Sequence, residues 1–243
     1  MVFLKKENFV FLGLLGIIVV IACCCGFLAF QKEEKEEVLS DSKKIQEEYA
    51  QYNNETNESV NRTYPLVELS ENNPFVYKNE EQVIEILEHK TGLIYFGFST
   101  CPWCRSILPV LEEAAAEKNV AEIAYLNIEN IRDVLELDEN EKIVTTKEGS
   151  NNYYRIVKLL DDYLEEYTLT DKEGKEISTG EKRLYAPTVL AVSNGKIVGF
   201  HSGSVETQKS GYDPLTEKEK EELKKIYTDM IEKMTEGTCN EGC

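Results

Sequence analysis

LIYFGFSTCPWC, residues 93–104, is the stretch that decides how this chain folds. Its first half is a short apolar run with the length of a buried strand. Behind the second cysteine, apolar residues recur at helical spacing. They are Ile107, Val110, Leu111, Ala114 and Ala115. The sequence therefore predicts a strand, a tight turn and a helix, with a Cys-x-x-Cys pair where the strand meets the helix.

A dithiol at such a junction is placed for redox chemistry. Cys101 lies at the predicted helix N-terminus, where unpaired backbone N–H groups and the helix dipole stabilise an anion. Pro102 suits the first helical turn, because its missing N–H would have no partner there. Since the thiolate is the reactive form of cysteine, we expect Cys101 to be the nucleophile. Cys104, one turn further on, is then the resolving thiol.

Two structural roles compete with the redox interpretation of this pair. A zinc site needs four ligands, and the soluble part of the chain offers one further cysteine pair, Cys239 and Cys243. An inert disulfide is the other alternative. Pro102 and the strand-to-helix context favour redox chemistry, so we expect neither a metal nor an organic cofactor.

The N-terminal part of the chain indicates a membrane anchor. Residues 9–30 carry no charge, and as a helix they would be about 33 Å long, enough to cross a hydrocarbon core of about 30 Å. Lys5 and Lys6 precede this run, and acids outnumber bases at 31–37. The positive-inside rule places residues 1–8 in the cytoplasm and the domain outside, in a single-pass protein of the cell membrane.

Two kinds of leader compete with the uncleaved anchor. A cleaved signal peptide has an apolar core of only about 7–15 residues. A lipoprotein signal fits better, because residues 20–23 read Val-Ile-Ala-Cys and processing there would leave Cys23 acylated. The apolar run continues past Cys23, which favours the anchor. Both the uncleaved anchor and the lipid would tether the domain outside the cytoplasmic membrane.

The overall composition limits the partners. The chain has 243 residues and a formal net charge of −18. Such an acidic surface repels nucleic acid and offers no basic patch to anionic lipids, so we expect neither as a partner. The chain beyond the anchor is long enough for one domain with a linker, and an outward location permits disulfides.

The predicted organisation beyond the anchor has three parts. Residues 31–73 are charged or rich in asparagine and predict a stalk, residues 74–237 form the domain, and residues 238–243 form a cysteine-containing tail. A less regular region at about 129–182 predicts an insertion within the domain.

Caps and periodicity predict the elements of the domain. Asn79 and Gln82 cap a helix that Gly92 closes, and Pro109 kinks the helix behind the cysteines. Thr216 and Glu219 form a capping box for a last helix that ends at Gly237. The other predicted elements are strands at 93–98 and 121–128, helices at 102–118 and 151–166, a hairpin at 169–178, and strands at 188–193 and 196–200 joined by Asn194-Gly195.

This order of elements resembles the thioredoxin fold over residues 75–128 and 183–236. Pro109 matches the kink proline of that family's active-site helix, residues 124–129 look like its third strand, and Ala186-Pro187-Thr188 looks like its cis-proline site. The resemblance implies an α/β domain with a mixed central sheet flanked by helices.

The resemblance also implies how a substrate binds. In the family the cis-proline loop faces the cysteine pair, so cis-Pro187 would turn the backbone edge of Ala186 towards an extended substrate segment. Trp103 between the cysteines and Gly203 after the final strand would border the same surface. A strand-leading trans proline is the alternative for Pro187.

The chain departs from thioredoxin at the site. Its motif is Cys-Pro-Trp-Cys instead of Cys-Gly-Pro-Cys, and Thr100 precedes it in place of tryptophan. Because the dipeptide helps set the redox potential, the direction of reaction stays open. Tyr95 stands where thioredoxin has a buried acid and Tyr125 where that acid has its lysine partner, so the usual internal proton acceptor is absent. Within the superfamily, membrane-anchored bacteriocin transport accessory proteins look most similar.

The leading hypothesis is a membrane-tethered, extracytoplasmic thiol–disulfide oxidoreductase acting on protein thiols and disulfides. The alternative is a non-enzymatic accessory or scaffold protein of a bacteriocin-type peptide exporter, with the insertion as its partner surface. A third hypothesis, reductant supply for haem-protein maturation, needs a membrane redox partner. Cys239 and Cys243 form either a bystander disulfide or a second redox pair that exchanges with Cys101 and Cys104.

Overall fold

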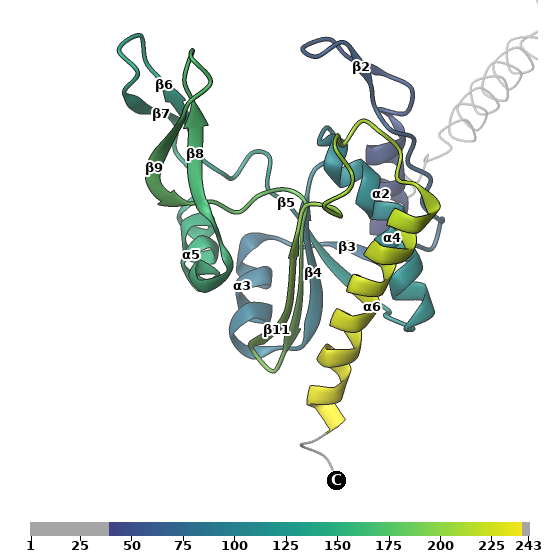
Figure 1. The fold of residues 1–243 in the computed structure, drawn as a ribbon. Helices are drawn as coiled ribbons and strands as arrows, with labels where there is room; N and C mark the ends of the chain where they lie inside the picture. Colours follow the sequence, from purple (N-terminus) through teal and green to yellow (C-terminus); the bar gives the residue numbers. More distant parts are fainter. Residues whose placement is uncertain (1–38, 240–243) are drawn as a thin grey trace, which may run out of the picture. The chain divides into compact units, whose positions relative to one another are not determined.

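A computed structural model describes residues 39–239 (Figure 1). The described residues form one compact unit. The predicted cytoplasmic segment 1–8, the anchor at 9–30 with Cys23, and Cys243 lie outside the described residues. Within the described range, no helix is both long and apolar enough to cross a membrane.

A five-stranded mixed sheet forms the centre of the domain, in the order β11-β10-β4-β5-β3. β3, β4 and β5 are parallel, while β10 is antiparallel to β4 and β11 is antiparallel to β10. The strands are β3 (Phe75–Tyr77), β4 (Gly92–Gly97), β5 (Ile123–Asn127), β10 (Thr188–Ser193) and β11 (Lys196–Ser202). A mixed central sheet in an α/β domain is the architecture that the sequence predicts.

Helices cover both faces of this sheet (Figure 1). α3 (Glu80–His89) and α5 (Asn151–Leu159) bury their apolar faces in one core, and α4 (Pro102–Glu117) and α6 (Glu217–Cys239) in the other. Successive side chains of a strand point to opposite faces, so β4 supplies both cores. Ile94 and Phe96 enter the first core, and Leu93 and Tyr95 enter the second.

Caps set the helix boundaries, with two differences from prediction. The Asn79–Gln82 capping box starts α3 as predicted, but α3 ends at His89, and Gly92 is the first residue of β4. The Thr216–Glu219 capping box precedes α6. α6 continues through Gly237 to Cys239, because glycine costs only about 1 kcal/mol inside a helix and does not by itself end one.

The prediction of a stalk over residues 31–73 is wrong from residue 39 onwards. α2 (Asp41–Ala50) packs into the second core, where Ile45 and Tyr49 are fully buried. Val67 and Leu69 enter the same core. Two apolar positions one turn apart give only a weak sequence signal, yet they suffice here because they form one face of a short helix.

The insertion at 129–182 is more regular than predicted. The predicted hairpin at 169–178 is confirmed as β8 (Glu166–Thr170) and β9 (Glu176–Lys182), but the helix predicted over 151–166 stops at Leu159 and a 3₁₀ turn follows at Asp161–Tyr163. A further hairpin, β6 (Val134–Leu137) and β7 (Ile143–Lys147), was not predicted, because β7 is exposed along its whole length. The loop predicted at 51–63 contains a two-residue ladder, β1 (Thr56–Asn57) and β2 (Arg62–Thr63).

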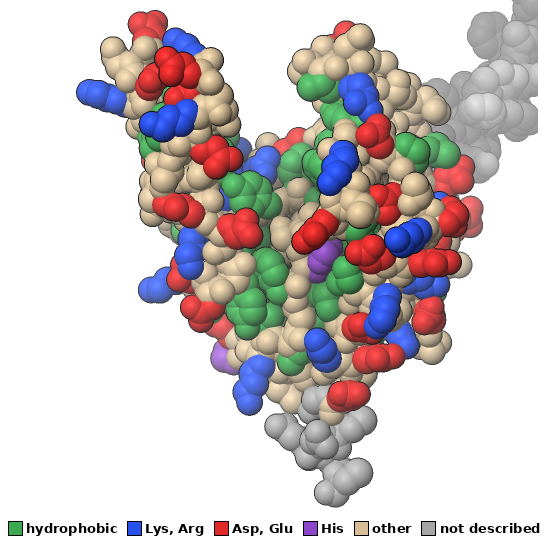
Figure 2. Space-filling model, in the orientation of Figure 1, with side chains coloured by type: hydrophobic (Ala, Val, Ile, Leu, Met, Phe, Trp, Pro, Cys, Tyr) green, Lys and Arg blue, Asp and Glu red, His purple; other side chains and the backbone are tan. Residues whose placement is uncertain are grey.

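The two hairpins of the insertion form one raised lobe, and the β1–β2 segment lies in another (Figure 1). Both rise from the end of the sheet at which β4 finishes. Figure 2 shows the face between the lobes hollowed, with hydrophobic side chains gathered there and mixed charges on the lobes.

Candidate active site

The two cysteines lie where β4 passes into α4. Cys101 is the N-cap of α4 and Pro102 is its first residue. The Cys101 sulfur accepts a hydrogen bond from the backbone N–H of Cys104 at 3.2 Å. Cys101 keeps 7 % of its surface exposed, Cys104 is fully buried, and both thiols are free. An incoming disulfide therefore meets Cys101 first.

The surroundings shift the pKa values of the two thiols in opposite directions. The hydrogen bond with the Cys104 side chain lowers the pKa of Cys101, burial opposes this, and the backbone N–H groups of Cys104 and Trp103 and the charge of Arg132 lower it further. Burial raises the pKa of Cys104 well above its ordinary value, and the neighbouring Cys101 raises it more. Cys101 is the thiol that ionises first, and Cys104 needs help to lose its proton.

The loop before β10 faces Cys101. The Ala186–Pro187 peptide bond is cis, the isomer that the sequence analysis expects. The Cys101 thiol donates to the Ala186 carbonyl at 3.5 Å, and the Gly203 N–H donates to the Pro187 carbonyl at 2.8 Å. The fold thus brings Cys101 together with three predicted site residues from a distant part of the chain, which are Ala186, Pro187 and Gly203.

An open pocket lies beside the cysteines, and Trp103, Ala186 and Gly203 line it with Tyr185, Val205 and Gln208. Trp103 is half-buried. A Cβ at Gly211 would lie 2.7 Å from the backbone nitrogen of Trp103, so the loop before α6 packs directly on the first turn of α4. The lining of the pocket therefore combines Ala186, whose carbonyl accepts from Cys101, with the aromatic residues Trp103 and Tyr185.

Arg105, directly behind Cys104, is a structural residue of the site that the sequence analysis missed. Only 1 % of it is exposed, and its guanidinium donates to four oxygens of neutral groups. These are Pro65 O at 2.9 Å, Tyr49 O at 2.8 Å, Ser99 O at 3.2 Å and Asn53 Oδ1 at 2.5 Å. Arg105 therefore joins the N-terminal segment to the cysteine helix. A basic residue next to the motif was its only signal.

A tyrosine cluster lies behind Cys104. Tyr95 is fully buried, and burial followed by the nearby Cys104 raises the pKa of Tyr95 well above its ordinary value. Its hydroxyl lies 2.9 Å from the hydroxyl of Tyr49, and its ring stacks on Tyr125 with centroids 5.2 Å apart. The position at which the sequence analysis notes a missing acid is thus filled by a hydroxyl group.

The expected absence of a metal stays a prediction. In the part of the chain that the structure describes, no three His, Cys, Asp or Glu side chains gather to hold an ion. His201 packs edge-on against Tyr227, and His89 is exposed at the end of α3. Cys239 ends α6, but neither its side chain nor Cys243 is described, so the second redox pair and the shared zinc site also stay predictions.

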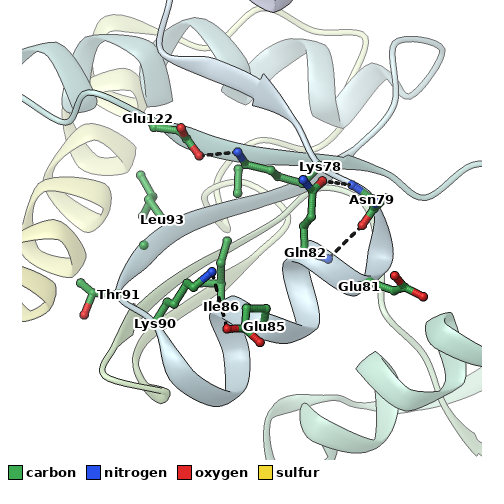
Figure 3. A pocket seen from close by; sticks show the side chains of 12 residues that line it. Lys78, Asn79, Glu81, Gln82, Glu85, Ile86, Lys90, Thr91, Leu93 and Glu122 are labelled. Atoms are coloured by element: carbon green, nitrogen blue, oxygen red, sulfur yellow. Dashed lines mark hydrogen bonds and ion pairs between the residues drawn. The ribbon is translucent and has the colours of Figure 1, made fainter.

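In a separate pocket at the start of α3, six of the polar residues pair with one another (Figure 3). Lys78 and Glu122 form an ion pair of 2.7 Å, and Lys90 lies 3.5 Å from Glu85. The Asn79–Gln82 capping box occupies the remaining labelled amides. These contacts satisfy the charges and the helix start locally, and no cysteine lines this pocket.

Comparison with known proteins adds no relative. No family model matches the chain, and no curated protein matches it. The functional conclusion therefore rests on the site itself.

Proposed function

We propose that the chain is a thiol–disulfide oxidoreductase of the thioredoxin-like class, acting on protein thiols and disulfides. The observation that carries this proposal is the division between the two cysteines. Cys101 is the partly exposed thiol with a lowered pKa at a helix N-terminus, and Cys104 is the buried thiol one turn behind it. A dithiol with this asymmetry suits exchange better than it suits a static crosslink.

The fold supports the class. The resemblance to thioredoxin implies a mixed central sheet flanked by helices and a cis proline that faces the cysteines, and the sheet of β3, β4, β5, β10 and β11 with cis-Pro187 fits that arrangement. The N-terminal helix α2 and the two-hairpin insertion are additions to it. We also propose that residues 9–30 anchor the domain outside the cell membrane, on the sequence evidence of an uncharged run behind Lys5 and Lys6.

In the reducing direction, exchange takes two steps. The Cys101 thiolate attacks one sulfur of a substrate disulfide, forming a mixed disulfide and releasing the other substrate sulfur as a thiolate that takes a proton from water. The Cys104 thiolate then attacks the Cys101 sulfur. The second substrate thiolate leaves, and a Cys101–Cys104 disulfide remains for a dithiol reductant to reopen. The oxidising direction runs the same steps backwards.

Substrate docking is proposed at the Ala186 edge. An extended segment pairing with this backbone would lie against the Cys101 thiol, which already contacts the Ala186 carbonyl at 3.5 Å. The half-buried Trp103 and Gly203 would flank the segment.

The test is a trapping experiment with the full-length chain. Cys104→Ser should accumulate disulfide-linked complexes with substrate proteins, because the resolving step is lost. Cys101→Ala should lose both these complexes and disulfide-exchange activity. Trapping through Cys104 in a Cys101→Ser variant would reverse the roles, and exchange by Cys101→Ala at the wild-type rate would overturn the proposed function.

A scaffold function in peptide export is the second candidate, and the exposed insertion favours it. Ile143 and Val144 of β7 are each 37 % exposed, on a hairpin outside the two cores. Secretion that persists in Cys101→Ala but fails when residues 134–147 are replaced by a short Gly-Ser linker would support the scaffold over the enzyme.

A further inference from the structure

The open pocket beside the cysteines is small and lies within reach of the reactive sulfur. Its volume is about 360 Å³, near the lower end of the range of about 300–1,000 Å³ for ligand sites, so it suits one side chain. Ala186 lines it, and the Ala186 carbonyl accepts from the Cys101 thiol at 3.5 Å. Because an extended segment rises about 3.3 Å per residue, a side chain about two positions from a substrate cysteine would reach the pocket while Cys101 attacks that cysteine.

The lining of this pocket carries one acidic side chain and no lysine or arginine. The acid is Glu206, which is exposed. Lys209 donates to the backbone carbonyl of Glu206 at 3.0 Å, and the carboxylate itself has no hydrogen bond or ion pair within the part of the chain that the structure describes. The cation nearest the motif on the other side, Arg132, lies over the ring of Phe98 and does not line the pocket. The pocket therefore presents one unpaired negative charge to an incoming group.

Two buried oxygen atoms of the lining residues have no partner. Gln208 is only 7 % exposed, and its side-chain nitrogen donates to Ser106 Oγ at 3.1 Å and to the Asp213 carbonyl at 2.8 Å. Because a backbone carbonyl only accepts, this contact fixes the orientation of the amide and leaves Oε1 as an acceptor. Gln208 Oε1 and Ser204 Oγ form no hydrogen bond among the described residues. A donor that enters the pocket can satisfy them after a small side-chain rotation.

Aromatic rings complete the lining. Trp103 is half-buried and Tyr185 is 39 % exposed. Gly211 packs against part of the indole, since a Cβ at Gly211 would lie 2.9 Å from Trp103 Cδ2. The cation–π contacts within the described part of the chain all involve other rings. Both rings therefore remain available to a cation that enters the pocket.

These features together favour a guanidinium group over other side chains. A guanidinium is planar, stacks on aromatic faces and donates through five N–H groups, so it can pair with the Glu206 carboxylate and still donate to an amide or hydroxyl oxygen. An acidic side chain would be repelled by Glu206. An apolar side chain would cover the rings but leave the carboxylate and the two oxygens without donors.

We propose that this pocket, which we call the Trp103–Glu206 pocket, binds an arginine side chain of the substrate about two residues from the substrate cysteine. The inference rests on the proposed function and names the class of substrate, which is proteins with an arginine close to the cysteine that reacts. The formal net charge of −18 attracts basic segments to the molecule, and the pocket then holds the arginine while the neighbouring cysteine meets Cys101.

The test measures substrate selectivity with the reduced full-length chain. Short peptides carry one cysteine as a mixed disulfide with 2-nitro-5-thiobenzoate, and arginine, citrulline, glutamate or phenylalanine stands one to three positions before or after it. The Cys101 thiolate attacks the peptide sulfur, and 2-nitro-5-thiobenzoate leaves as a coloured thiolate whose absorbance gives the rate. Each rate is divided by that of the same peptide with 2-mercaptoethanol, which corrects for intrinsic reactivity. Citrulline is the neutral isostere of arginine, so the ratio of their corrected rates reports the charge.

At physiological salt we expect the arginine peptide to react about tenfold faster than the citrulline peptide in at least one position, from a cation–π contact and a charge-assisted hydrogen bond. Glu206→Lys should abolish this preference and favour the glutamate peptide. Glu236→Lys is the matched control, because it makes the same change of charge at an exposed position. Glu219, which accepts from Thr207 beside Glu206, lies about 25 Å along α6 from Glu236, well beyond the screening length of about 8 Å.

Several results would count against the arginine pocket. Equal corrected rates for the arginine and citrulline peptides in every position overturn it, and so does a preference for phenylalanine, which would indicate an apolar occupant. An unchanged preference in Glu206→Lys also overturns it, and an equal loss in Glu236→Lys would assign the preference to the net charge of the molecule. A wild-type protein that releases no 2-nitro-5-thiobenzoate from any peptide overturns the proposed function itself.

Discussion

Replacing Arg105 by methionine tests how the site is held together. The change keeps the aliphatic stem and removes a buried guanidinium that donates to four oxygens. Each buried acceptor left without a donor costs about 1–3 kcal/mol. Water can enter to bind some of these acceptors, and methionine no longer carries a charge that must be buried, so part of this cost is offset. We therefore expect the free energy of unfolding to fall by about 3–5 kcal/mol, as in other proteins that lose one partner of a buried charge network.

The assay is urea unfolding of the reduced chain from residue 39, followed by the fluorescence of Trp103, the single tryptophan. At about 2 kcal/mol per molar urea, the expected loss lowers the midpoint by about 1.5–2.5 M. Arg62→Met is the matched control, because Arg62 forms an exposed pair with Asp213 and should cost less than about 1 kcal/mol. Equal urea midpoints for the two variants would refute the claim that Arg105 stabilises the fold by joining the N-terminal segment to α4.

Three further predictions concern Ile45, His201 and the C-terminal tail. Ile45→Ala should lower the free energy of unfolding by about 2–4 kcal/mol because Ile45 is fully buried. Leu66→Ala, at a position 56 % exposed, should lower it by less than about 0.5 kcal/mol. Equal urea midpoints for the two variants would support a stalk at residue 45 instead of a packed helix. Burial lowers the pKa of His201, so unfolding takes up a proton as pH falls from about 6.5, and the wild type should lose stability there while His201→Phe does not. Truncation after Glu236 should leave the rate of disulfide exchange unchanged if the tail is a bystander. Slower exchange by the truncated protein than by the full-length protein would support a second redox pair in the tail.

The elements that the sequence predicts well are those with local signals. Strand, turn and helix at residues 92–117 follow from one apolar run, one proline and one periodic stretch. Asn194-Gly195 closes the β10–β11 hairpin, as that dipeptide predicts, with both residues at positive φ. Such features depend on neighbours along the chain, so the printed sequence contains them.

The features that escape prediction depend on distant contacts. Tyr49 and Tyr95 share a hydrogen bond across 46 positions, and nothing near either tyrosine indicates the other. Arg105 can be buried because its guanidinium meets four oxygens, and three of them lie at least 40 positions away in the chain. β7 is exposed throughout and is held by its partner β6, so it has no apolar alternation to reveal it.

The pH dependence of alkylation at Cys101 tests the central claim most directly. The reduced full-length chain is treated with iodoacetamide between pH 5 and pH 10, and mass spectrometry scores Cys101 and Cys104 separately. The structure predicts that Cys101 reacts first, with a midpoint below the value of about 8.5 for a free thiol, and that Cys104 stays unlabelled until much higher pH. A Cys101 midpoint at or above 8.5, or earlier labelling of Cys104, would contradict the nucleophile on which the proposed function depends.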